Sequence, residues 1–275
     1  MTGIIFDIDD TLYSRRNMIL RAARDVLQSC TDKSAAAQAA DGNTPSESDI
    51  LATVCRESSA AAEDRFMKVF YECSDENFPR IMAGQITPWQ SNVERFVKTL
   101  SRLGVIAEEK DGVAFADRYE WMQEHLTLSG QLEHMMDRLA SCSGILLGVM
   151  TNGTSDRQRK KFSMLGLDRY IDPGMVVVSG EVGASKPDSA IFRAAQERFG
   201  LVPDDLWMVG DSVSADIRGA KACGWHTLWL CRGGEKAGKV DADLIAESEE
   251  EMSRLVLELA GASASDDKEN RAVRT

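Results

Sequence analysis

The chain has 275 residues, of which 43% are hydrophobic and 28% charged, a balance typical of folded globular proteins. The formal net charge of -12 at pH 7 argues against nucleic acid polymers and membranes as partners, because anionic surfaces attract clustered Lys and Arg. No run of about 18 apolar residues occurs, and the N-terminus has no basic region or cleavage site. We therefore expect a cytoplasmic protein, monomeric or homodimeric.

The six cysteines and three histidines show no spacing typical of metal ligands or disulfide frameworks. No CxxC pair occurs among the cysteines, and His125, His134 and His226 likewise lack the spacing of metal ligands. We expect these side chains to be structural or incidental.

The first predicted strand is apolar and ends in acidic residues. Residues Gly3–Asp7 favour a β-strand, and the chain continues as Ile8-Asp9-Asp10-Thr11. A single acidic strand end is usually a solvated turn or a helix cap, so this segment alone indicates no chemistry.

Residues 14–127 have the period of amphipathic helices and little strand signal. We expect helices at Asn17–Ser29, Ile50–Cys73 and Val93–Leu103, with Asp41–Ser48 as a loop between the first two. The pattern predicts a small helical bundle inserted after the first strand.

Residues 128–248 alternate apolar runs with helical periods. The runs are Ile145–Met150, Met175–Val178, Leu206–Val209 and Thr227–Cys231, and the helices are expected at Ser155–Leu165, Asp188–Phe199 and Ser214–Cys223. This alternation predicts an α/β fold with a doubly wound parallel sheet covered by helices on both faces. A last helix is expected within 249–261, and the polar residues 262–275 are expected to form a disordered tail.

Polar side chains follow several of the predicted strands. Asp7–Thr11 follow the first strand, Thr151–Gly153 follow the second, and Gly210–Asp216 follow a later one. Ligands of open parallel sheets bind beyond the carboxyl ends of the strands, so these segments should converge at one edge. Their coincidence, together with the isolated pair Lys186-Pro187, is a far stronger signal than any one of them.

These segments resemble the motifs of a known family. DIDDT at Asp7–Thr11, TNG at Thr151–Gly153, KP at Lys186-Pro187 and GDSVSAD at Gly210–Asp216 are similar to the four motifs of the haloacid dehalogenase-like (HAD) superfamily. The resemblance implies a Rossmann-like catalytic core of residues 1–13 and 128–248, and a type-one α-helical cap at 14–127, as in subfamily I. DIDDTLY, TNG and VSGEVGASKPDSAIF look closest to the branch of 5'-nucleotidases and N-acylneuraminate-9-phosphatases.

The resemblance implies a phosphatase that hydrolyses a small phosphomonoester, with nucleotide or sugar phosphates favoured. Asp7 would attack phosphorus and carry an aspartyl-phosphate. Asp9 would protonate the leaving alkoxide and later activate water, which requires a pKa near working pH that neighbouring acids and burial can provide. Lys186 would hold Asp7 and the phosphoryl group, while Thr151 and the amide of Asn152 would bind phosphoryl oxygens.

Magnesium is the implied cofactor, since Mg²⁺ prefers hard oxygen ligands. By resemblance, Asp7 and Asp211 give side-chain oxygens, Asp9 gives its backbone carbonyl, and Asp216 supports the site. Asp10 is expected to be a turn residue.

Three other functions stay open. A phosphomutase keeps both Asp7 and Asp9, so phosphate release against isomerisation decides between them. A haloacid dehalogenase uses no magnesium and lacks the second acid, which this chain keeps as Asp9. A non-catalytic binding protein on the same fold would be expected to lose Asp7, Asp9, Lys186 or Asp211, and all four are present.

Overall fold

The computed structural model describes residues 1–38, 60–232 and 240–261. The chain divides into two compact units, one of Met1–Ser14 with Leu126–Thr275 and the other of Arg15–His125. The predicted loop Asp41–Ser48, residues 50–59 of a predicted helix and the predicted tail 262–275 lie outside the described residues.

A six-stranded parallel sheet forms the centre of the first unit, with the strand order β3-β2-β1-β4-β5-β6. The strands are β1 (Thr2–Phe6), β2 (Ile145–Thr151), β3 (Val176–Val178), β4 (Leu206–Gly210), β5 (His226–Leu230) and β6 (Leu244–Ala246). The central strands are almost continuously apolar because both faces of a parallel sheet are covered. The predicted fold class is confirmed.

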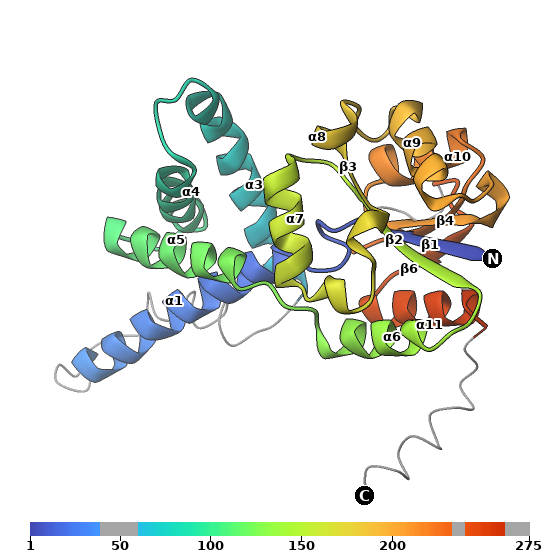
Figure 1. The fold of residues 1–275 in the computed structure, drawn as a ribbon. Coiled ribbons are helices and arrows are strands. Elements are labelled where there is room, and N and C mark those ends of the chain that lie inside the picture. Colours follow the sequence, from blue (N-terminus) through green and yellow to red (C-terminus); the bar gives the residue numbers. More distant parts are fainter. Residues whose placement is uncertain (39–59, 233–239, 262–275) are drawn as a thin grey trace, which may run out of the picture. The chain divides into compact units, whose positions relative to one another are not determined.

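Helices cover the sheet on its two faces (Figure 1). The helices of this unit are α6 (Gly130–Ala140), α7 (Ser155–Met164), α8 (Ser179–Val182), α9 (Ser189–Phe199), α10 (Arg218–Ala222) and α11 (Glu249–Leu259). A π-helical turn lies at Val213–Ile217, and 3₁₀ turns lie at Leu167–Arg169, Pro173–Met175 and Pro203–Asp205. α9 and α10 lie on one face, where Phe192 packs with Ile5 and Met208, and α6 and α11 lie on the other.

Helix caps explain where α9 and α11 begin. Asp188 accepts a hydrogen bond from the backbone N–H of Ala190, and Ser248 accepts one from Glu251. Both side chains satisfy an N–H that the first helical turn leaves without a partner. The helix predicted at Ser214–Cys223 is instead the π-helical turn followed by the short α10.

The strand order reverses at β1, which pairs with β2 on one side and with β4 on the other. Phe6, the last residue of β1, lies opposite Val149 and Val209. The residues that follow β1, β2 and β4 therefore reach the same edge of the sheet, at the point where open α/β sheets bind ligands.

The second unit is a bundle of α1 (Arg15–Gln38), α3 (Ala60–Met82), α4 (Pro88–Arg102) and α5 (Glu109–Glu124). Its core is aromatic: the rings of Phe96 and Phe115 stack with centroids 4.3 Å apart. The predicted end of a helix at Cys73 is wrong, because α3 continues through a polar stretch to Met82.

The helix α5 was not predicted, since its sequence contains a glycine and is weakly amphipathic. Gly112 allows α5 to approach α4 closely: a Cβ on Gly112 would lie 2.7 Å from the carbonyl oxygen of Val93. The glycine therefore permits contact between two helices and does not interrupt α5.

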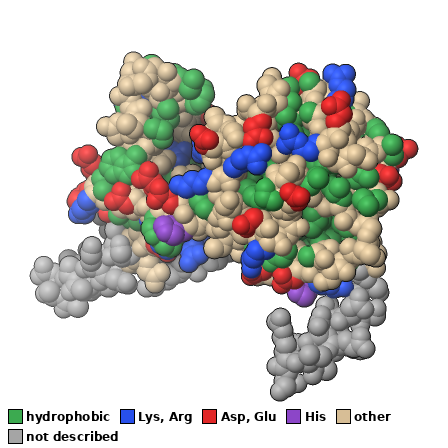
Figure 2. All heavy atoms as spheres, viewed as in Figure 1, with side chains coloured by type: hydrophobic (Ala, Val, Ile, Leu, Met, Phe, Trp, Pro, Cys, Tyr) green, Lys and Arg blue, Asp and Glu red, His purple; other side chains and the backbone are tan. Residues whose placement is uncertain are grey.

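The surface carries charges of both signs. Figure 2 shows Lys and Arg side chains interspersed with Asp, Glu and apolar side chains on the visible face. Within the described ranges, no helix has the length and hydropathy needed to cross a membrane.

Candidate active site

Asp7 lies immediately beyond β1 and is buried, with 6% of its surface exposed. Its backbone N–H donates to the carbonyl oxygen of Val209 at 2.9 Å, which fixes it against the end of β4. The Nζ of Lys186 donates to Oδ1 of Asp7 at 2.7 Å. A carboxylate is therefore held at the edge where the strand order reverses.

Lys186 is also buried, and its ammonium group has three acceptors. Besides Asp7, it donates to Oδ1 of Asp216 at 2.6 Å and to the carbonyl oxygen of Met150 at 2.9 Å. An ammonium group has three protons, so these bonds satisfy all of them. The expected contact of Lys186 with a phosphoryl group would require one of these protons to change its acceptor.

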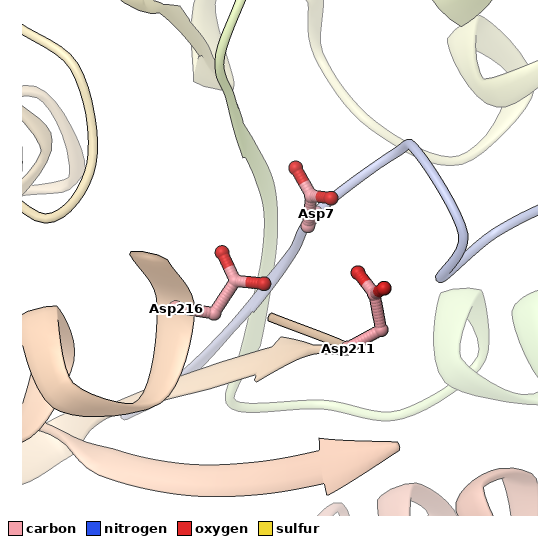
Figure 3. Close-up of side chains that lie close together, drawn as sticks. All are labelled: Asp7, Asp211 and Asp216. Atoms are coloured by element: carbon pink, nitrogen blue, oxygen red, sulfur yellow. The ribbon is translucent and has the colours of Figure 1, made fainter. Parts of the chain in front are cut away.

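Asp7, Asp211 and Asp216 bring three carboxylates together, and one oxygen from each lies within 4.8 Å of the others. Figure 3 shows that they come from the end of β1, the end of β4 and the following helical turn. Opposite ligands of Mg²⁺ lie about 4 Å apart, so small side-chain rotations would fit these hard oxygen donors to such an ion. The donor set suits a divalent cation.

The position of Asp216 depends on the π-helical turn and on a glycine. Its Oδ2 accepts from the backbone N–H of Ser212 at 3.0 Å, while Oδ1 pairs with Lys186. A Cβ on Gly210 would lie 2.3 Å from this Oδ2. Only glycine at residue 210 leaves room for the carboxylate in this position.

Burial and charge shift the titration of Asp7 and Lys186. Desolvation raises the pKa of Asp7 to about 6; Lys186 opposes this rise, and Asp216 and Asp9 add to it. Burial would lower the pKa of Lys186, but Asp216 and Asp7 together raise it above its usual value. The ammonium group therefore stays charged over the physiological pH range.

The turn Thr151–Gly153 offers a hydroxyl group with no hydrogen-bond partner. Oγ1 of Thr151 is buried and, among the described residues, finds no partner. Buried polar groups are normally satisfied, so such an orphan is consistent with a ligand that supplies the missing bond. The side chain of Asn152 exchanges two hydrogen bonds with the backbone of Lys186, at 2.9 and 3.0 Å, which ties the turn to the lysine.

The side chain of Asp9 does not join the three clustered carboxylates and contacts α7 instead. Its Oδ1 accepts from Tyr13 and Lys161, and its Oδ2 accepts from Gln158 at 3.0 Å. Burial raises the pKa of Asp9, but the Lys161 charge and these hydrogen bonds outweigh burial and lower it. The expectation of a pKa near working pH is therefore wrong for this conformation, because a cation and not another acid lies nearest.

Asp10 adopts the left-handed conformation, with φ at 61°. Its carbonyl oxygen accepts from Nε of Arg232 at 2.9 Å, and the carbonyl of Thr11 accepts from Nη2 of the same arginine at 3.1 Å. This conformation is uncommon outside glycine, although Asp tolerates it in turns. The expected turn role of Asp10 agrees with this geometry.

Four side chains at the site were not predicted from the sequence: Tyr13, Gln158, Lys161 and Arg232. Arg232 follows β5 closely, so the rule that found the acids at other strand ends would have found it as well. Gln158 and Lys161 lie one turn apart on the helix that follows TNG, a spacing that places them on one face.

Comparisons with known proteins identify the family of the chain. A model of the family described as haloacid dehalogenase-like hydrolase matches residues 1–224. The glyceraldehyde 3-phosphate phosphatase of Methanocaldococcus jannaschii is 26% identical over 261 residues, which cover 94% of this chain and 97% of that protein. The phosphoserine phosphatase of Thermus thermophilus is 42% identical over 90 residues, but these cover only 33% of this chain and 35% of that protein.

Solved structures share the fold. The putative HAD-hydrolase YfnB from Bacillus subtilis, in a crystal form bound to magnesium, superposes with a TM-score of 0.52 at 21% identity, covering 93% of this chain and 98% of that one. The family match begins at residue 1 and extends across β1, β2, β3 and β4. The chain therefore belongs to the haloacid dehalogenase-like hydrolase family.

Proposed function

We propose that the chain is a magnesium-dependent phosphatase that hydrolyses a small phosphomonoester through an aspartyl-phosphate on Asp7. The observation that carries the proposal is the buried Asp7 carboxylate, paired with Lys186 at 2.7 Å and clustered with Asp211 and Asp216. Membership of the hydrolase family and the names of two relatives, a phosphoserine phosphatase and a glyceraldehyde 3-phosphate phosphatase, support it.

Asp7 is the nucleophile of the proposal. One of its oxygens forms a bond to phosphorus while the bond from phosphorus to the leaving oxygen breaks. Lys186 fixes the orientation of the carboxylate and offsets negative charge where phosphoryl oxygens gather. Burial favours this attack because it strips water from the carboxylate before substrate binds.

Asp9 is the proposed acid and base. It gives a proton to the leaving alkoxide and then takes one from the water that attacks the aspartyl-phosphate, which returns Asp7 as a carboxylate and releases phosphate. In the conformation described, Asp9 is bound to Lys161, Tyr13 and Gln158. Proton transfer therefore requires the leaving oxygen to replace part of this contact.

Asp7 and Asp211 would hold Mg²⁺ with side-chain oxygens, and Asp9 would hold it with its backbone carbonyl. Asp216, fixed by its hydrogen bond from the N–H of Ser212, would support the site. When bound, the ion supplies positive charge that offsets repulsion between the substrate dianion and the carboxylates. Without it, the acids at this edge would repel a phosphate ester.

Thr151, Asn152 and Lys186 form the proposed phosphoryl site. The buried hydroxyl of Thr151 would donate to a phosphoryl oxygen, which would satisfy its hydrogen bonding. The backbone N–H of Asn152 would donate to a second phosphoryl oxygen.

The proposed cap, expected at residues 14–127, corresponds to the helical unit Arg15–His125. The residues of the proposed catalytic, phosphoryl and metal sites all belong to the sheet unit. The helical unit can then serve to exclude water and to contact the part of the substrate beyond the phosphoryl group. Substrate choice among nucleotide and sugar phosphates is therefore assigned to the cap.

The test is phosphate release from a panel of nucleotide, sugar and small-acid phosphates, in Mg²⁺ and in excess EDTA. We expect turnover that chelation abolishes and that Asp7→Asn reduces below a few per cent of the wild-type rate. Asp168→Asn, which removes an exposed acid from the same unit, is the charge-matched control and should retain activity.

Two outcomes would contradict the proposal. Turnover that persists in EDTA would remove the metal assignment. Isomerisation of a sugar phosphate without phosphate release would identify a phosphomutase instead.

A further inference from the structure

Gln158 and Lys161 contact Asp9 from one face of α7. They lie one helical turn apart and therefore point to the same side. Gln158 is 2% exposed and the side chain of Lys161 12% exposed, although both residue types usually lie at the surface. A buried amide and a partly buried ammonium group need partners, and both donate to Asp9.

Both carboxylate oxygens of Asp9 are occupied. Oδ1 accepts from Lys161 and from the hydroxyl of Tyr13, and Oδ2 accepts from Nε2 of Gln158 at 3.0 Å. Two donors belong to α7, and the third, Tyr13, lies four residues after Asp9 in the sequence. Bonds from two directions leave the carboxylate little freedom to rotate, so its orientation is set by these side chains.

Gln158 also joins Asp9 to the phosphoryl-binding turn. Nε2 donates to the carbonyl oxygen of Asn152 at 2.9 Å, so one amide group uses both of its protons on this site. The turn is shaped to admit it, because a Cβ on Gly153 would lie 2.6 Å from Nε2. The distance between Asp9 and Asn152 is therefore fixed through a single side chain.

We infer that Gln158 and Lys161 are positioning residues for proton transfer by Asp9. They hold its carboxyl group at a fixed place relative to the turn that binds the phosphoryl group. The inference rests on the proposed function, since it gives these residues a role only through Asp9. It goes beyond the four motifs, which contain neither residue.

Loss of this positioning should slow the steps in which Asp9 transfers a proton and should leave a step without proton transfer nearly unchanged. Attack of Asp7 on 4-nitrophenyl phosphate expels a leaving group that needs no proton, so loss of positioning should leave this step nearly unchanged. Departure of an alkoxide takes a proton from Asp9, and hydrolysis of the aspartyl-phosphate gives one to it as water attacks phosphorus. Both of these steps should slow.

The experiment compares Gln158→Leu with the wild-type enzyme on 4-nitrophenyl phosphate and on the best alkyl phosphate of the panel. We expect kcat for the alkyl phosphate to fall about 100-fold, the lower limit for loss of acid–base catalysis. With 4-nitrophenyl phosphate, Gln158→Leu should release the first equivalent of nitrophenol at nearly the wild-type rate. Slow turnover should follow as the phosphoenzyme accumulates. Gln131→Leu, at an exposed position of α6, is the matched control and should behave as wild type.

A double-mutant cycle with Asp9→Asn gives the decisive readout. If Gln158 acts through Asp9, the double variant should be no slower than Asp9→Asn alone. Additive losses, or an equal loss of burst rate and turnover, would overturn the inference. Lys161→Met takes the place of Gln158→Leu in the same cycle if the latter does not fold, and Lys161→Arg should restore part of the lost rate.

Failure of the inference and failure of the proposed function look different. If the proposed function is wrong, the wild-type enzyme releases no phosphate from any ester. If only the inference is wrong, the wild-type enzyme releases phosphate, and the variants lose activity additively.

Discussion

Replacement of the proposed nucleophile should stabilise the metal-free protein. In the absence of a metal ion, desolvation of the buried Asp7 carboxylate is the largest cause of its raised pKa; Lys186 lowers this pKa, and the charges of Asp216 and Asp9 raise it. Asp7→Asn removes the charge but keeps an oxygen that can accept from Lys186. The substitution should therefore remove an unfavourable interaction at the site, as is typical where function requires a buried charge.

The magnitude follows from linkage between protonation and folding. The pKa of Asp7 rises from 3.8 to about 6 on folding, and about 1.4 kcal/mol per pKa unit converts this difference to about 3 kcal/mol. Because the folded protein binds this proton more tightly, the stabilisation by protonation is complete below pH 3.8 and is lost as the pH rises through about 6. Asp7→Asn should therefore raise the free energy of unfolding by up to about 3 kcal/mol at pH 8, and by less at pH 5.

Urea denaturation in EDTA at pH 8 and pH 5 measures this difference, with Asp9→Asn as the contrasting variant. The pKa of Asp9 is lowered by Lys161 and by its hydrogen bonds despite burial, so its charge stabilises the fold above its unfolded pKa. Asp9→Asn should thus destabilise the protein at pH 8, by about 1 kcal/mol or more. If Asp7→Asn also destabilised the metal-free protein, or if its effect did not depend on pH, the electrostatic account of Asp7 would be wrong.

Three further predictions concern packing and metal binding. Phe115→Ala should lower the stability of the helical unit by about 3 to 5 kcal/mol in urea denaturation, because Phe115 is fully buried and stacks on Phe96; an effect below about 1 kcal/mol would contradict the packing described. Gly210→Ala should weaken Mg²⁺ binding in calorimetry, because its Cβ would displace Asp216, whereas Gly130→Ala, whose Cβ meets nothing within 4 Å, should bind as wild type. Calcium should inhibit in competition with magnesium, since its larger and looser coordination would misplace Asp7, and full activity with calcium alone would refute this.

The sheet could be predicted because its strands are buried on both faces and read as apolar runs. Strands β1, β2, β3, β4 and β5 were all predicted to within one residue at each end. Strand β6, at Leu244–Ala246, was missed because three residues at the sheet edge carry too little pattern. The helix predicted at Ser214–Cys223 begins as a π-helical turn instead of an α-helix. In this turn the Asp216 carboxylate reaches both the N–H of Ser212 and the ammonium group of Lys186.

The convergence of acids could be predicted from strand ends, but the direction of each side chain could not. Asp7 and Asp9 are two residues apart, yet one contacts Lys186 and the other contacts α7. Two of the three partners of Asp9, Gln158 and Lys161, are 149 and 152 residues away in the sequence, and no local pattern encodes those contacts. The lowered pKa of Asp9 follows from this long-range pairing, which is why sequence reasoning expected the opposite.

The aspartyl-phosphate on Asp7 can be tested directly by locating the phosphoryl group during turnover. The wild-type enzyme is mixed with a good substrate from the panel and Mg²⁺, quenched rapidly in acid, digested and mapped by mass spectrometry. We predict a phosphorylated peptide that contains Asp7, with Asp7 as the modified residue, and no such peptide from Asp7→Asn. Phosphorylation at another residue, or full turnover with no phosphoenzyme on the quench timescale in both wild type and Asp9→Asn, would contradict it.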